Sequence, residues 1–585
     1  MHWHQWNDEA FQRARERACP VLLFLRAGWC PRCDDLASRT LADESVLRLL
    51  TEKFVCIEVD KDQSPEIDAR YRNGGWPTLA WLDADGELLG AANSIDADPL
   101  VQRLTQVSEL YPDRLDELPD GTVEGGAPRG DQPAPLSQAR PGPRGPAPEL
   151  SMEVVDDVVE TLIETADPLH GGWGTRQKFP HPEALHFLIV RWTQTGDKRI
   201  LKIVLRTLRR MQQGQIYDRV EGGFYRYATH ADWSVPHHEK RLESNAQRML
   251  AYVEAHQAFG DKTFKETATG ILEWMHSTLL DGETRAFKGS QDADPIYAHL
   301  PTREARAQHG PPDCDPTIFT HWNAMTVSSL LKAALVLDED RYRVQALVTL
   351  EFLMENLWDE RDGMYHYWDG TYNLPGMLSD QAYTLRALVE AMHYAGENQY
   401  LDRAVKLARH AIENLQAEDG AFYDRLRSSR SSGPQRNRSI LENAVMAESL
   451  VRLSHMTRDT YFAERARATL RSFAGDYRRY GHFVAGYGRA IDLLFHEPVH
   501  ITIVGAHGTD ETRALREAAL RPYVASRVVQ TVDPVADREL LARCRLPAPD
   551  GQAARAYLHQ GRESYAETSK PERLPALLSR AERSN

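Results

Sequence analysis

The spacing of apolar and polar residues divides the chain into two parts with different patterns. Up to about residue 111, short apolar runs alternate with segments whose apolar residues recur every three or four positions. Strands that alternate with helices predict a compact α/β domain over residues 1–111. The predicted order is a strand at Val21–Leu25, a helix from about Cys30, a strand at Phe54–Val59, a helix at Pro65–Tyr71, a strand at Thr78–Leu82, a turn at "DADG", a short strand and a final helix.

From residue 151 to residue 497 the helical spacing dominates, as in "RMLAYVEAHQAF" and "AYTLRALVEAMHYAG". Loops that pair glycine with aromatic residues recur in this region, at intervals long enough for two helices each. Six such loops predict six helical hairpins, which close naturally into an all-α (α/α)6 toroid with the loops around one mouth. The loops are "GGWG" (171), "GGFYRY" (222), "AFKGSQDAD" (286), "GMYHYW" (363), "GAFYDR" (420) and "GHFVAGYG" (481).

Two further segments complete the predicted organisation. Residues 112–150 contain nine prolines and six glycines, which offer little to bury and predict an exposed linker. Strand-like runs are rare until "VHITIVG" near residue 500, so residues 498–585 are expected to form a small C-terminal α/β extension with short strands and a helix. The fold class is therefore multidomain, with an α/β domain followed by the toroid and this extension.

Composition narrows the class of protein. The chain has 585 residues, of which 42% are apolar and 26% charged, with a net charge of -15, so a nucleic-acid partner is not expected. No stretch approaches ~18 consecutive apolar residues, and we expect no membrane partner. The start "MHWHQWNDEAF" lacks the basic and apolar regions of a signal peptide, which favours a cytoplasmic protein.

Only one pair among the six cysteines has a spacing that suggests chemistry. Cys30 and Cys33 follow the apolar run Val21–Leu25, and a cysteine that opens a helix gains thiolate character from the unpaired backbone N–H groups. A zinc site would need two more ligands, and no second CxxC is present. Chance spacing of two buried cysteines is the remaining alternative. We predict a redox pair, with no metal site and no cofactor.

Residues 3–110 resemble a thioredoxin-fold domain, with "WCPRC" in the place of the active site and "GGWPT" in the place of the loop beside it. The resemblance implies a cis peptide bond before Pro77. If the cysteine pair is redox-active, we expect Trp29, Arg32 and Trp76 to form its contact surface. The resemblance also implies a buried acid six residues before the first cysteine. Phe24 occupies that position, so the usual proton acceptor is missing there.

Residues 215–247 hold the densest group of polar and aromatic side chains in the helical region. Such a group can supply acids, bases and stacking faces, although each member has a structural alternative as a solvated or capping residue. The members are Asp218, Arg226, Tyr227, Asp232, Trp233, His237, His238, Glu239 and Lys240.

This segment, together with "GGWGTRQKFPHP", "GSQDADP", "HWNAM" and "LSDQAY", resembles the spermatogenesis-associated thioredoxin-like family. The resemblance implies a thioredoxin-like domain followed by a six-hairpin toroid related in fold to N-acylglucosamine 2-epimerases and glycoside hydrolases. It does not assign a reaction. The chain departs from the family where Cys30-Pro31-Arg32-Cys33 replaces Cys-His-Trp-Cys, and where Ser244 stands in place of an acid before Asn245.

Three hypotheses follow. The first is thiol–disulfide exchange with a protein partner, with Cys30 as nucleophile, Cys33 as resolving thiol and the toroid as platform. The second is a sugar epimerase or glycoside hydrolase with a sugar ligand in the toroid, and the third is a non-catalytic scaffold. In the second hypothesis the side chains that stack on the sugar are Trp173, Tyr227, Trp233, Trp322, Tyr365 and Trp368. The candidate acids are Asp232, Glu239, Asp292, Asp294, Asp380 and Glu442, and the candidate imidazoles are His237, His238 and His321. Asp292 and Asp294 are also candidates for binding calcium or for shaping a loop.

Overall fold

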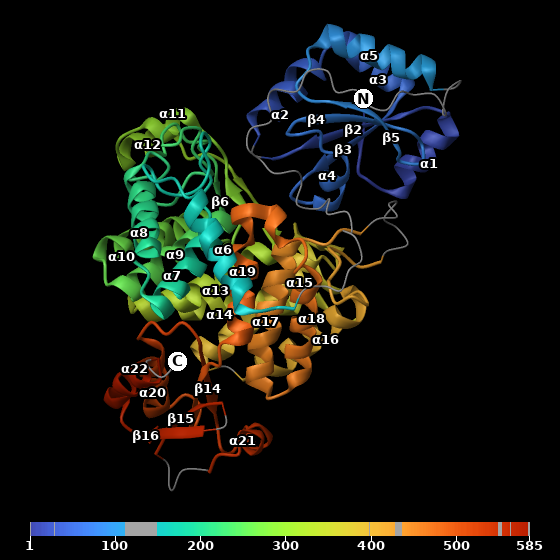
Figure 1. Cartoon of the computed structure of the whole chain (residues 1–585). Helices are drawn as coiled ribbons and strands as arrows, with labels where there is room; N and C mark the ends of the chain where they lie inside the picture. Colours follow the sequence, from blue (N-terminus) through green and yellow to red (C-terminus); the bar gives the residue numbers. More distant parts are fainter. Residues whose placement is uncertain are drawn as a thin grey trace. The chain divides into compact units, whose positions relative to one another are not determined.

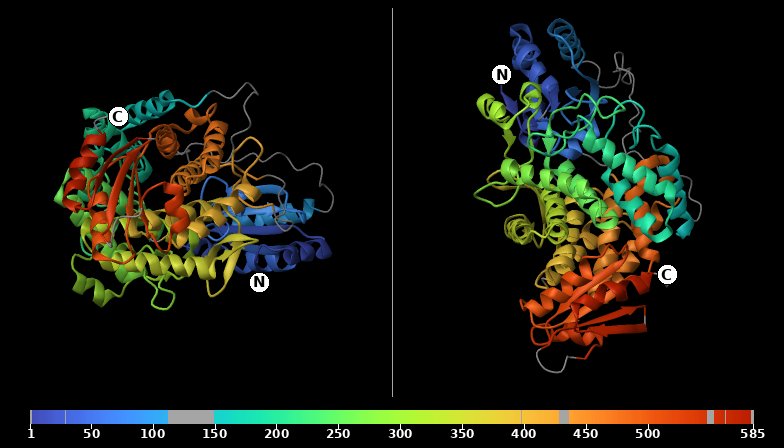
Figure 2. Two further views of the ribbon diagram at one scale, coloured as in Figure 1. Left: turned by 90° about the horizontal axis from the view of Figure 1, so that it is seen from below. Right: turned by 90° about the vertical axis from the view of Figure 1, so that its left-hand side faces the viewer.

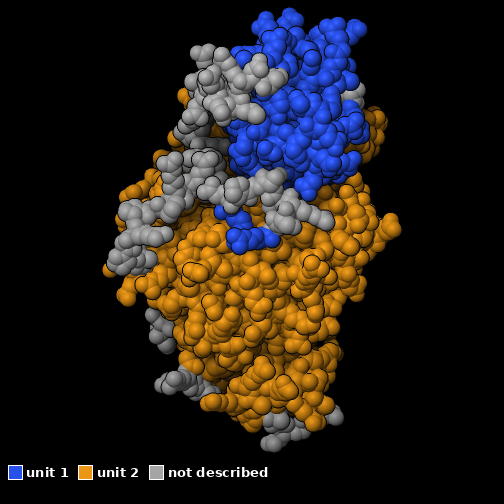
Figure 3. Space-filling model, turned by 90° about the vertical axis from the view of Figure 1, so that its right-hand side faces the viewer, with its two compact units in different colours: residues 1–137, 427–436 blue, residues 138–426, 437–585 orange. Residues whose placement is uncertain are grey.

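The computed structural model of the chain describes residues 2–28, 30–111, 149–396, 398–427, 436–547, 553–561 and 563–582. It divides into two compact units, residues 1–137 with 427–436 and residues 138–426 with 437–585 (Figure 3). The predicted linker at 112–150 lies almost wholly outside the described residues, and the predicted domain boundaries stay predictions. Within the described ranges, no helix combines the length and the apolar character needed to cross a bilayer.

The first unit is a five-stranded sheet with helices on both faces (Figure 1). The strand order is β1-β3-β2-β4-β5; β2 runs parallel to β3 and antiparallel to β4, and β5 is antiparallel to β4. The elements are β1 Trp3–His4, α1 Asp8–Arg17, β2 Val21–Arg26, α2 Pro31–Asp35, α3 Glu44–Lys53, β3 Val55–Asp60, α4 Pro65–Tyr71, β4 Thr78–Leu82, β5 Leu88–Ala92 and α5 Ala97–Leu110.

Alternate residues of the central strand β2 serve two separate cores. Leu22 and Phe24 pack with α3, α5 and the two cysteines Cys30 and Cys33. Leu23 and Leu25 point to the opposite face, where α1 and α4 cover them. The predicted α/β domain is confirmed, but its predicted order omitted α1 and α3. Helix α1 is strongly charged and buries few residues, so its apolar periodicity is weak.

The second unit is a closed ring of helical hairpins, as the sequence predicts (Figure 2). Six inner helices pack side by side in chain order, and the last packs against the first. Each is backed by an outer helix from its own hairpin or, for the last, by α6. The inner helices are α7 Pro182–Thr195, α9 Leu242–Phe259, α13 Thr320–Leu337, α15 Leu378–Glu390, α17 Ile440–Thr457 and α19 Ala485–Phe495; the outer helices are α6 Met152–Thr165, α8 Lys198–Gln213, α10 Lys262–Trp274, α14 Asp340–Asn356, α16 Tyr400–Leu415 and α18 Thr460–Ser472.

The connections at the two ends of the ring differ in length. From an inner helix to the next outer helix the chain turns tightly, for example through the left-handed residue Gly260 and the helix cap Asp261. From an outer helix to the next inner helix it makes the long connections that contain the glycine-aromatic loops. We call this end of the ring, where the inner helices begin, the loop-bearing end.

The long connections contain short strands and helices that the apolar spacing did not predict. Most of these strands have only two residues, too few for a period of two to be visible in the sequence. A longer antiparallel pair, β11 with β12, leads into α15. The additional elements are β6 Lys240–Arg241, β7 Ser290–Gln291, α11 Pro295–His299, α12 Arg303–His309, β8 Cys314–Asp315, β9 Ile318–Phe319, β10 Trp358–Asp359, β11 Gly363–Trp368 and β12 Tyr372–Pro375.

An amide side chain in the fourth position of four inner helices fixes the neighbouring loop. In α17, Asn443 accepts a hydrogen bond from the Phe422 N–H (2.6 Å) and donates to the Phe422 carbonyl (3.0 Å) and to the Ser439 carbonyl (2.8 Å). The same three bonds are made in α9, α13 and α15. The amide and loop residue of those three pairs are Asn245 with Phe224, Asn323 with Phe287, and Gln381 with Met364. We call this arrangement the amide clamp.

In three of the four clamped loops, a glycine one or two residues before the clamped residue lies directly against an outer helix, whereas Ala286 precedes the clamped Phe287. Gly223 has a φ of 79°, and a Cβ there would lie 2.9 Å from the ring of Trp274. Gly420 has a φ of 96°, and a Cβ there would meet the backbone of Ala468 at 2.6 Å. Both the left-handed backbone and the close approach require glycine. The repeated loop motif in the sequence therefore marks the points where loop and outer helix touch.

The C-terminal segment forms a four-stranded sheet at the opposite end of the ring (Figure 2). Its contacts go to the ends of inner helices: the Val529 N–H lies 3.2 Å from His393 Nδ1, and Gln530 donates to the Met456 carbonyl. The strand order is β14-β13-β15-β16, which confirms the predicted α/β extension. The elements are β13 Val499–Val504, α20 Asp510–Leu520, β14 Arg527–Val532, α21 Arg538–Cys544, β15 Arg555–Gln560, β16 Glu563–Thr568 and α22 Leu574–Glu582.

Charged side chains, as well as apolar ones, fill the interior between the inner helices. The carboxylate of Glu448 is buried and lies within 3.0 Å of the guanidinium groups of Arg386, Arg452 and Arg489. Burial alone would raise the pKa of Glu448, but the three positive charges lower it well below its usual range. The ring is therefore held partly by compensated charges, which are costly to separate.

Candidate functional site

The two cysteines of the first unit lie at the start of α2. Cys30 is the residue before the first turn, and the Cys33 N–H donates to the Cys30 carbonyl (2.8 Å). Both thiols are free and buried, and Cys30 Sγ lies 3.8 Å from the Trp76 carbonyl. The Trp76–Pro77 peptide bond is cis, as the resemblance implies, and Pro77 is buried. The predicted contact residue Trp29 lies outside the described residues.

The two thiols have opposite acidities. A hydrogen bond from the Cys33 thiol lowers the pKa of Cys30 to about 7, with help from the backbone N–H groups of Arg32 and Cys33. The same hydrogen bond and burial raise the pKa of Cys33 far above its ordinary value. Near neutral pH, Cys30 is therefore partly ionised, whereas Cys33 is protonated.

An acid lies one strand away from the position where the sequence lacks one. Phe24 of β2 pairs in register with Glu58 of β3, so both side chains lie on the same face of the sheet. That face carries the cluster that contains Cys30 and Cys33. Arg26 joins Glu58 (3.0 Å) to Asp34 (2.9 Å), the residue that follows Cys33. A carboxylate on the neighbouring strand therefore lies on the sheet face that the cysteine-containing cluster covers.

Trp76, beside Cys30, is held by polar neighbours. Its indole N–H donates to Asp68 (2.7 Å), and the ring lies between the cations of Lys61 (5.2 Å) and Arg72 (5.0 Å). These contacts fix a half-buried aromatic ring next to the nucleophile.

The polar group predicted at residues 215–247 forms an interlocked cluster. Asp218 lies 2.6 Å from both Lys240 and Arg306, and all three side chains are buried. Glu239 is completely buried, with Arg226 at 3.6 Å. These ion pairs tie the chain segment that precedes α9 to helix α12, so the charges have a structural role.

The aromatic and imidazole members of the segment stack on one another. Tyr227 stacks on His237, with ring centroids 5.5 Å apart, and His238 packs edge-on against Tyr225. Burial lowers the pKa of His237 and of His238 to about 4, so both imidazoles are neutral near pH 7. Asp232 is exposed and accepts from the Ser234 N–H in a local turn.

Three of the four predicted stacking tryptophans expose almost no ring surface, whereas Trp368 is half-buried. Trp173, Trp233 and Trp322 are at most 3% exposed. The indole N–H groups of Trp173 and Trp233 donate to the carbonyls of Leu162 and His170. In this arrangement the three rings pack inside the loops and do not form an accessible face.

The two aspartates after β7 occupy a loop. The Asp292 N–H donates to the Asp313 carbonyl (2.8 Å). Asp294 caps α11 by accepting from the Tyr297 N–H (2.9 Å). The loop-shaping role is one of the alternatives that the sequence left open for Asp294. The hydrogen bond to the Tyr297 N–H supports that role, because it stabilises the start of a helix.

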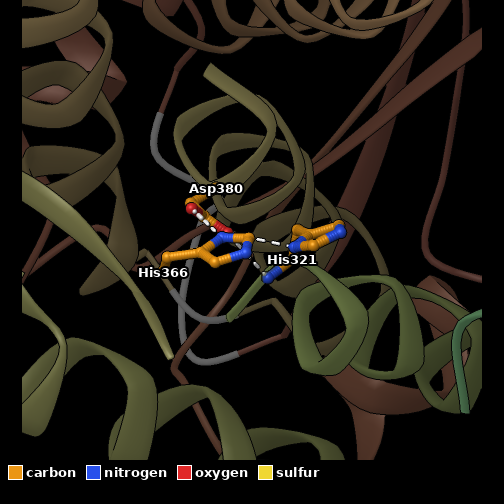
Figure 4. Close-up of side chains that lie close together, drawn as sticks. All are labelled: His321, His366 and Asp380. Carbon is orange, nitrogen blue, oxygen red and sulfur yellow. Dashed lines mark hydrogen bonds and ion pairs between the residues drawn. The ribbon is translucent and has the colours of Figure 1, made fainter. Parts of the chain in front are cut away.

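Three side chains from separate elements meet at the loop-bearing end of the ring (Figure 4). Asp380, in the first turn of α15, is fully buried. One of its oxygens lies 3.1 Å from His321 Nδ1 at the start of α13, and the other 2.8 Å from His366 Nδ1 in β11. Burial would raise the pKa of Asp380, but the two imidazoles lower it. We call His321, His366 and Asp380 the triad.

Glu442 is an acid close to the triad. It stands in the third position of α17, which corresponds to the position of Asp380 in α15. Burial, together with the carboxylates of Asp424 and Asp380, raises the pKa of Glu442 to about 8.

The structure brings together some of the candidates predicted from sequence and separates others. Asp380, His321 and Glu442 share the loop-bearing end, whereas Asp232 is exposed on a turn and Asp294 caps a short helix. His366 was not predicted, and it completes the triad. Its only sequence signal is its place inside the glycine-aromatic loop "GMYHYW".

Comparison with known proteins finds a family model that matches the N-terminal residues and relatives that match a larger share of the chain. Residues 1–120 match the family model Thioredox_DsbH, described as "Protein of unknown function, DUF255". Spermatogenesis-associated protein 20 from Homo sapiens is 24% identical, and the match covers 91% of this chain and 84% of the human protein. The Mus musculus protein of the same name is 29% identical over 57% of this chain, but that match spans only 43% of the mouse protein's length. The chain therefore has a thioredoxin-like domain at its N-terminus and homologues named spermatogenesis-associated protein 20.

Solved structures resemble a little more than half of the chain. A sugar epimerase from a ruminal bacterium is 13% identical, with a TM-score of 0.48, and the match covers 59% of this chain and 98% of that one. The cellobiose 2-epimerase of Spirochaeta thermophila is 15% identical, with a TM-score of 0.46 and the same coverage of both chains.

Proposed function

We propose that the first unit is a thiol–disulfide oxidoreductase in which Cys30 attacks a substrate disulfide and Cys33 resolves the mixed disulfide. The observation that supports the proposal most strongly is the hydrogen bond from the Cys33 thiol to Cys30, which lowers the pKa of Cys30. With a pKa of about 7, Cys30 is about half thiolate at neutral pH, and the thiolate is the nucleophile. The cis-Pro77 loop beside it offers the Trp76 carbonyl as a neighbour for the reacting sulfur.

In the proposed reaction the Cys30 thiolate attacks one sulfur of the substrate disulfide and expels the other sulfur as a thiolate. Cys33 then gives up its proton and attacks Cys30 Sγ, which releases the second substrate thiol and leaves a Cys30–Cys33 disulfide. The two electrons pass from the cysteine pair to the substrate. An external dithiol donor returns them and restores both thiols.

The second step requires a base for Cys33, because its pKa is raised. We assign this role to Glu58, which lies on the sheet face that the cysteine-containing cluster covers and is linked through Arg26 to Asp34, the residue after Cys33. The Glu58 side chain is 32% exposed, so a proton that it accepts can pass on to water. In this scheme Glu58 replaces the acid that Phe24 displaces.

Glu58→Gln should slow the resolving step by ~10-fold or more, because general-base assistance typically contributes ~100-fold or more. The measurement is the stopped-flow release of the second thionitrobenzoate after Cys30 has reacted with Ellman's reagent. Adding Phe24→Asp to Glu58→Gln should restore part of the rate by returning an acid to the usual position. Glu52→Gln, an exposed acid on α3, is the control. An unchanged second phase in Glu58→Gln would remove Glu58 from the mechanism.

The experiment that tests the proposed function is mechanism-based trapping in the full chain. Cys33→Ser should accumulate mixed disulfides with protein partners, because the resolving thiol is absent. Cys30→Ser should accumulate none. The adducts are counted on non-reducing gels and identified by mass spectrometry. If Cys33→Ser forms no adducts and the unsubstituted chain does not reduce insulin, the proposal is wrong.

A sugar ligand for the second unit stays a prediction from the sequence. Candidate acids and an imidazole, Asp380, Glu442 and His321, do lie together at the loop-bearing end. Of the aromatic side chains expected to stack on a sugar, Trp173, Trp233 and Trp322 are buried, whereas Tyr227, Tyr365 and Trp368 are half-buried. Any stacking on a sugar in this unit would therefore fall to the half-buried rings.

A further inference from the structure

We propose that the triad of His321, His366 and Asp380 binds a divalent transition-metal ion of the zinc class. The three side chains each offer one ligand atom, and these atoms lie within 4.8 Å of one another. Two imidazole nitrogens and one carboxylate oxygen form a donor set that suits zinc and similar ions, whereas calcium and magnesium prefer oxygen ligands.

The backbone places the three donors before any ligand arrives. His366 lies in β11, which pairs with β9 through Tyr367 and Phe319, and β9 leads directly into the start of α13 and His321. At the other end of β11, the amide clamp of Gln381 fixes Met364 to α15. Gln381 is the residue that follows Asp380 in that helix. Each donor is therefore fixed by a strand pairing or an amide clamp, as a preorganised site requires.

The spacing of the donors fits one ion. Ligand atoms ~2.0–2.1 Å from a tetrahedral zinc ion lie ~3.3 Å apart. The carboxylate oxygens of Asp380 lie 2.8 Å and 3.1 Å from the two Nδ1 atoms. These two contacts use different oxygens of Asp380, and the three ligand atoms, one from each residue, lie within 4.8 Å of one another, so small side-chain movements bring them to the spacing of a coordination sphere.

Local charge favours a cation at this point. Asp380 is fully buried, and its carboxylate contacts two imidazoles and the backbone N–H of His321. A divalent ion would offset the charge of this buried carboxylate, and each neutral imidazole would carry its proton on the ring nitrogen that does not bind the ion.

The site would be of the open kind. Three protein ligands leave at least one coordination position for water or a substrate oxygen, as in catalytic zinc sites. The His321 side chain is 16% exposed, whereas His366 and Asp380 are almost fully buried, so access from solvent is by way of His321. The ion would then act as a Lewis acid at the loop-bearing end, independently of the thiol chemistry of the first unit.

The test uses Co²⁺ as a spectroscopic probe on the full chain. Thiolates also bind Co²⁺, so the experiment is done in a Cys30→Ser/Cys33→Ser background. Titration should produce the visible absorption of tetrahedral or five-coordinate Co²⁺, saturating at about one ion per chain, and zinc should abolish it by displacement. Asp380→Asn and His366→Asn should each weaken Co²⁺ binding by ~100-fold or more, since removal of even an outer partner costs ~10–100-fold.

His186→Asn is the matched control. His186 is also a buried imidazole in an inner helix and lies 2.6 Å from Glu254, but it is not part of the triad. This variant should bind Co²⁺ like the parent. If Asp380→Asn does not fold, as judged by thermal unfolding, His321→Asn replaces it, because that side chain is partly exposed.

Two results would overturn the proposal. The first is a folded parent chain with no saturable Co²⁺ spectrum, which would leave Asp380 as a hydrogen-bond acceptor for two imidazoles. The second is a spectrum that persists unchanged in both His366→Asn and Asp380→Asn. Neither result affects the insulin or trapping assays of the first unit, so the two proposals can fail separately.

Discussion

Cys30→Ser should reduce the disulfide reductase activity of the full chain by ~1,000-fold or more. Loss of the attacking atom of a covalent mechanism leaves only non-covalent effects, and substitutions of this kind cost several powers of ten. The measurement is insulin reduction with dithiothreitol as the electron donor. Cys19→Ser is the control, because Cys19 is a buried thiol of the same unit, away from α2, whose pKa is raised by burial.

The acidity of Cys30 gives this prediction a pH dependence. Because the pKa of Cys30 is lowered to about 7, its rate of alkylation by iodoacetamide should rise with pH and reach half its maximum near pH 7. Cys33→Ala removes the largest cause of the lowering, so the midpoint should move up toward the ordinary thiol value of ~8.5. A midpoint near that value in the unsubstituted chain, or full activity in Cys30→Ser, would contradict the proposed role of Cys30.

Glu448→Leu should destabilise the second unit by ~3–5 kcal/mol, the cost of removing one partner from a buried ion pair. The substitution leaves the guanidinium groups of Arg386, Arg452 and Arg489 without the carboxylate that all three contact. The measurement is denaturant unfolding. Glu160→Leu removes an exposed acid that contacts Arg199 at 2.8 Å, and should change stability by ~1 kcal/mol or less.

The lowered pKa of Glu448 also predicts that the folded chain loses stability at low pH. The pKa of Glu448 is lower in the folded chain than in the unfolded chain, so its contribution to stability is fully present above the unfolded value of ~4.3. The contribution is lost as the pH falls from there toward the folded pKa. The unfolding midpoint of the unsubstituted chain should therefore drop more steeply below about pH 4 than that of Glu448→Leu. Equal acid sensitivity of the two chains would contradict the assignment.

Local sequence signals are sufficient to predict much of the fold. The helix Pro65–Tyr71 and the strand Thr78–Leu82 have the boundaries that their apolar spacing predicts, because each begins or ends at proline, glycine or a turn residue. The ring is predictable for a different reason. Several loops repeat the same contact with an outer helix, and the glycine that this contact requires, such as Gly223 or Gly420, is visible in the sequence.

The triad could not be predicted from spacing, because its residues come from α13, β11 and α15 and meet only through strand pairing and helix packing. Residue type was also a poor guide to exposure. Trp173 and Trp233 were chosen as stacking faces, yet large aromatic rings fill cores as often as they line sites. Glu58 was missed because its relation to Phe24 is a cross-strand pairing, and strand register is not visible in a single sequence.

The amide clamps have a consequence for how the ring tolerates change. Each clamp ties a loop to the first turn of an inner helix at one residue, such as Phe422, so the chain between that residue and the helix begins and ends at fixed points. Residues inserted between the two points would lengthen the loop without altering the register of either helix. Natural variation and engineered grafts should therefore accumulate in these intervals, and the loop-bearing end can acquire new surfaces on an unchanged ring.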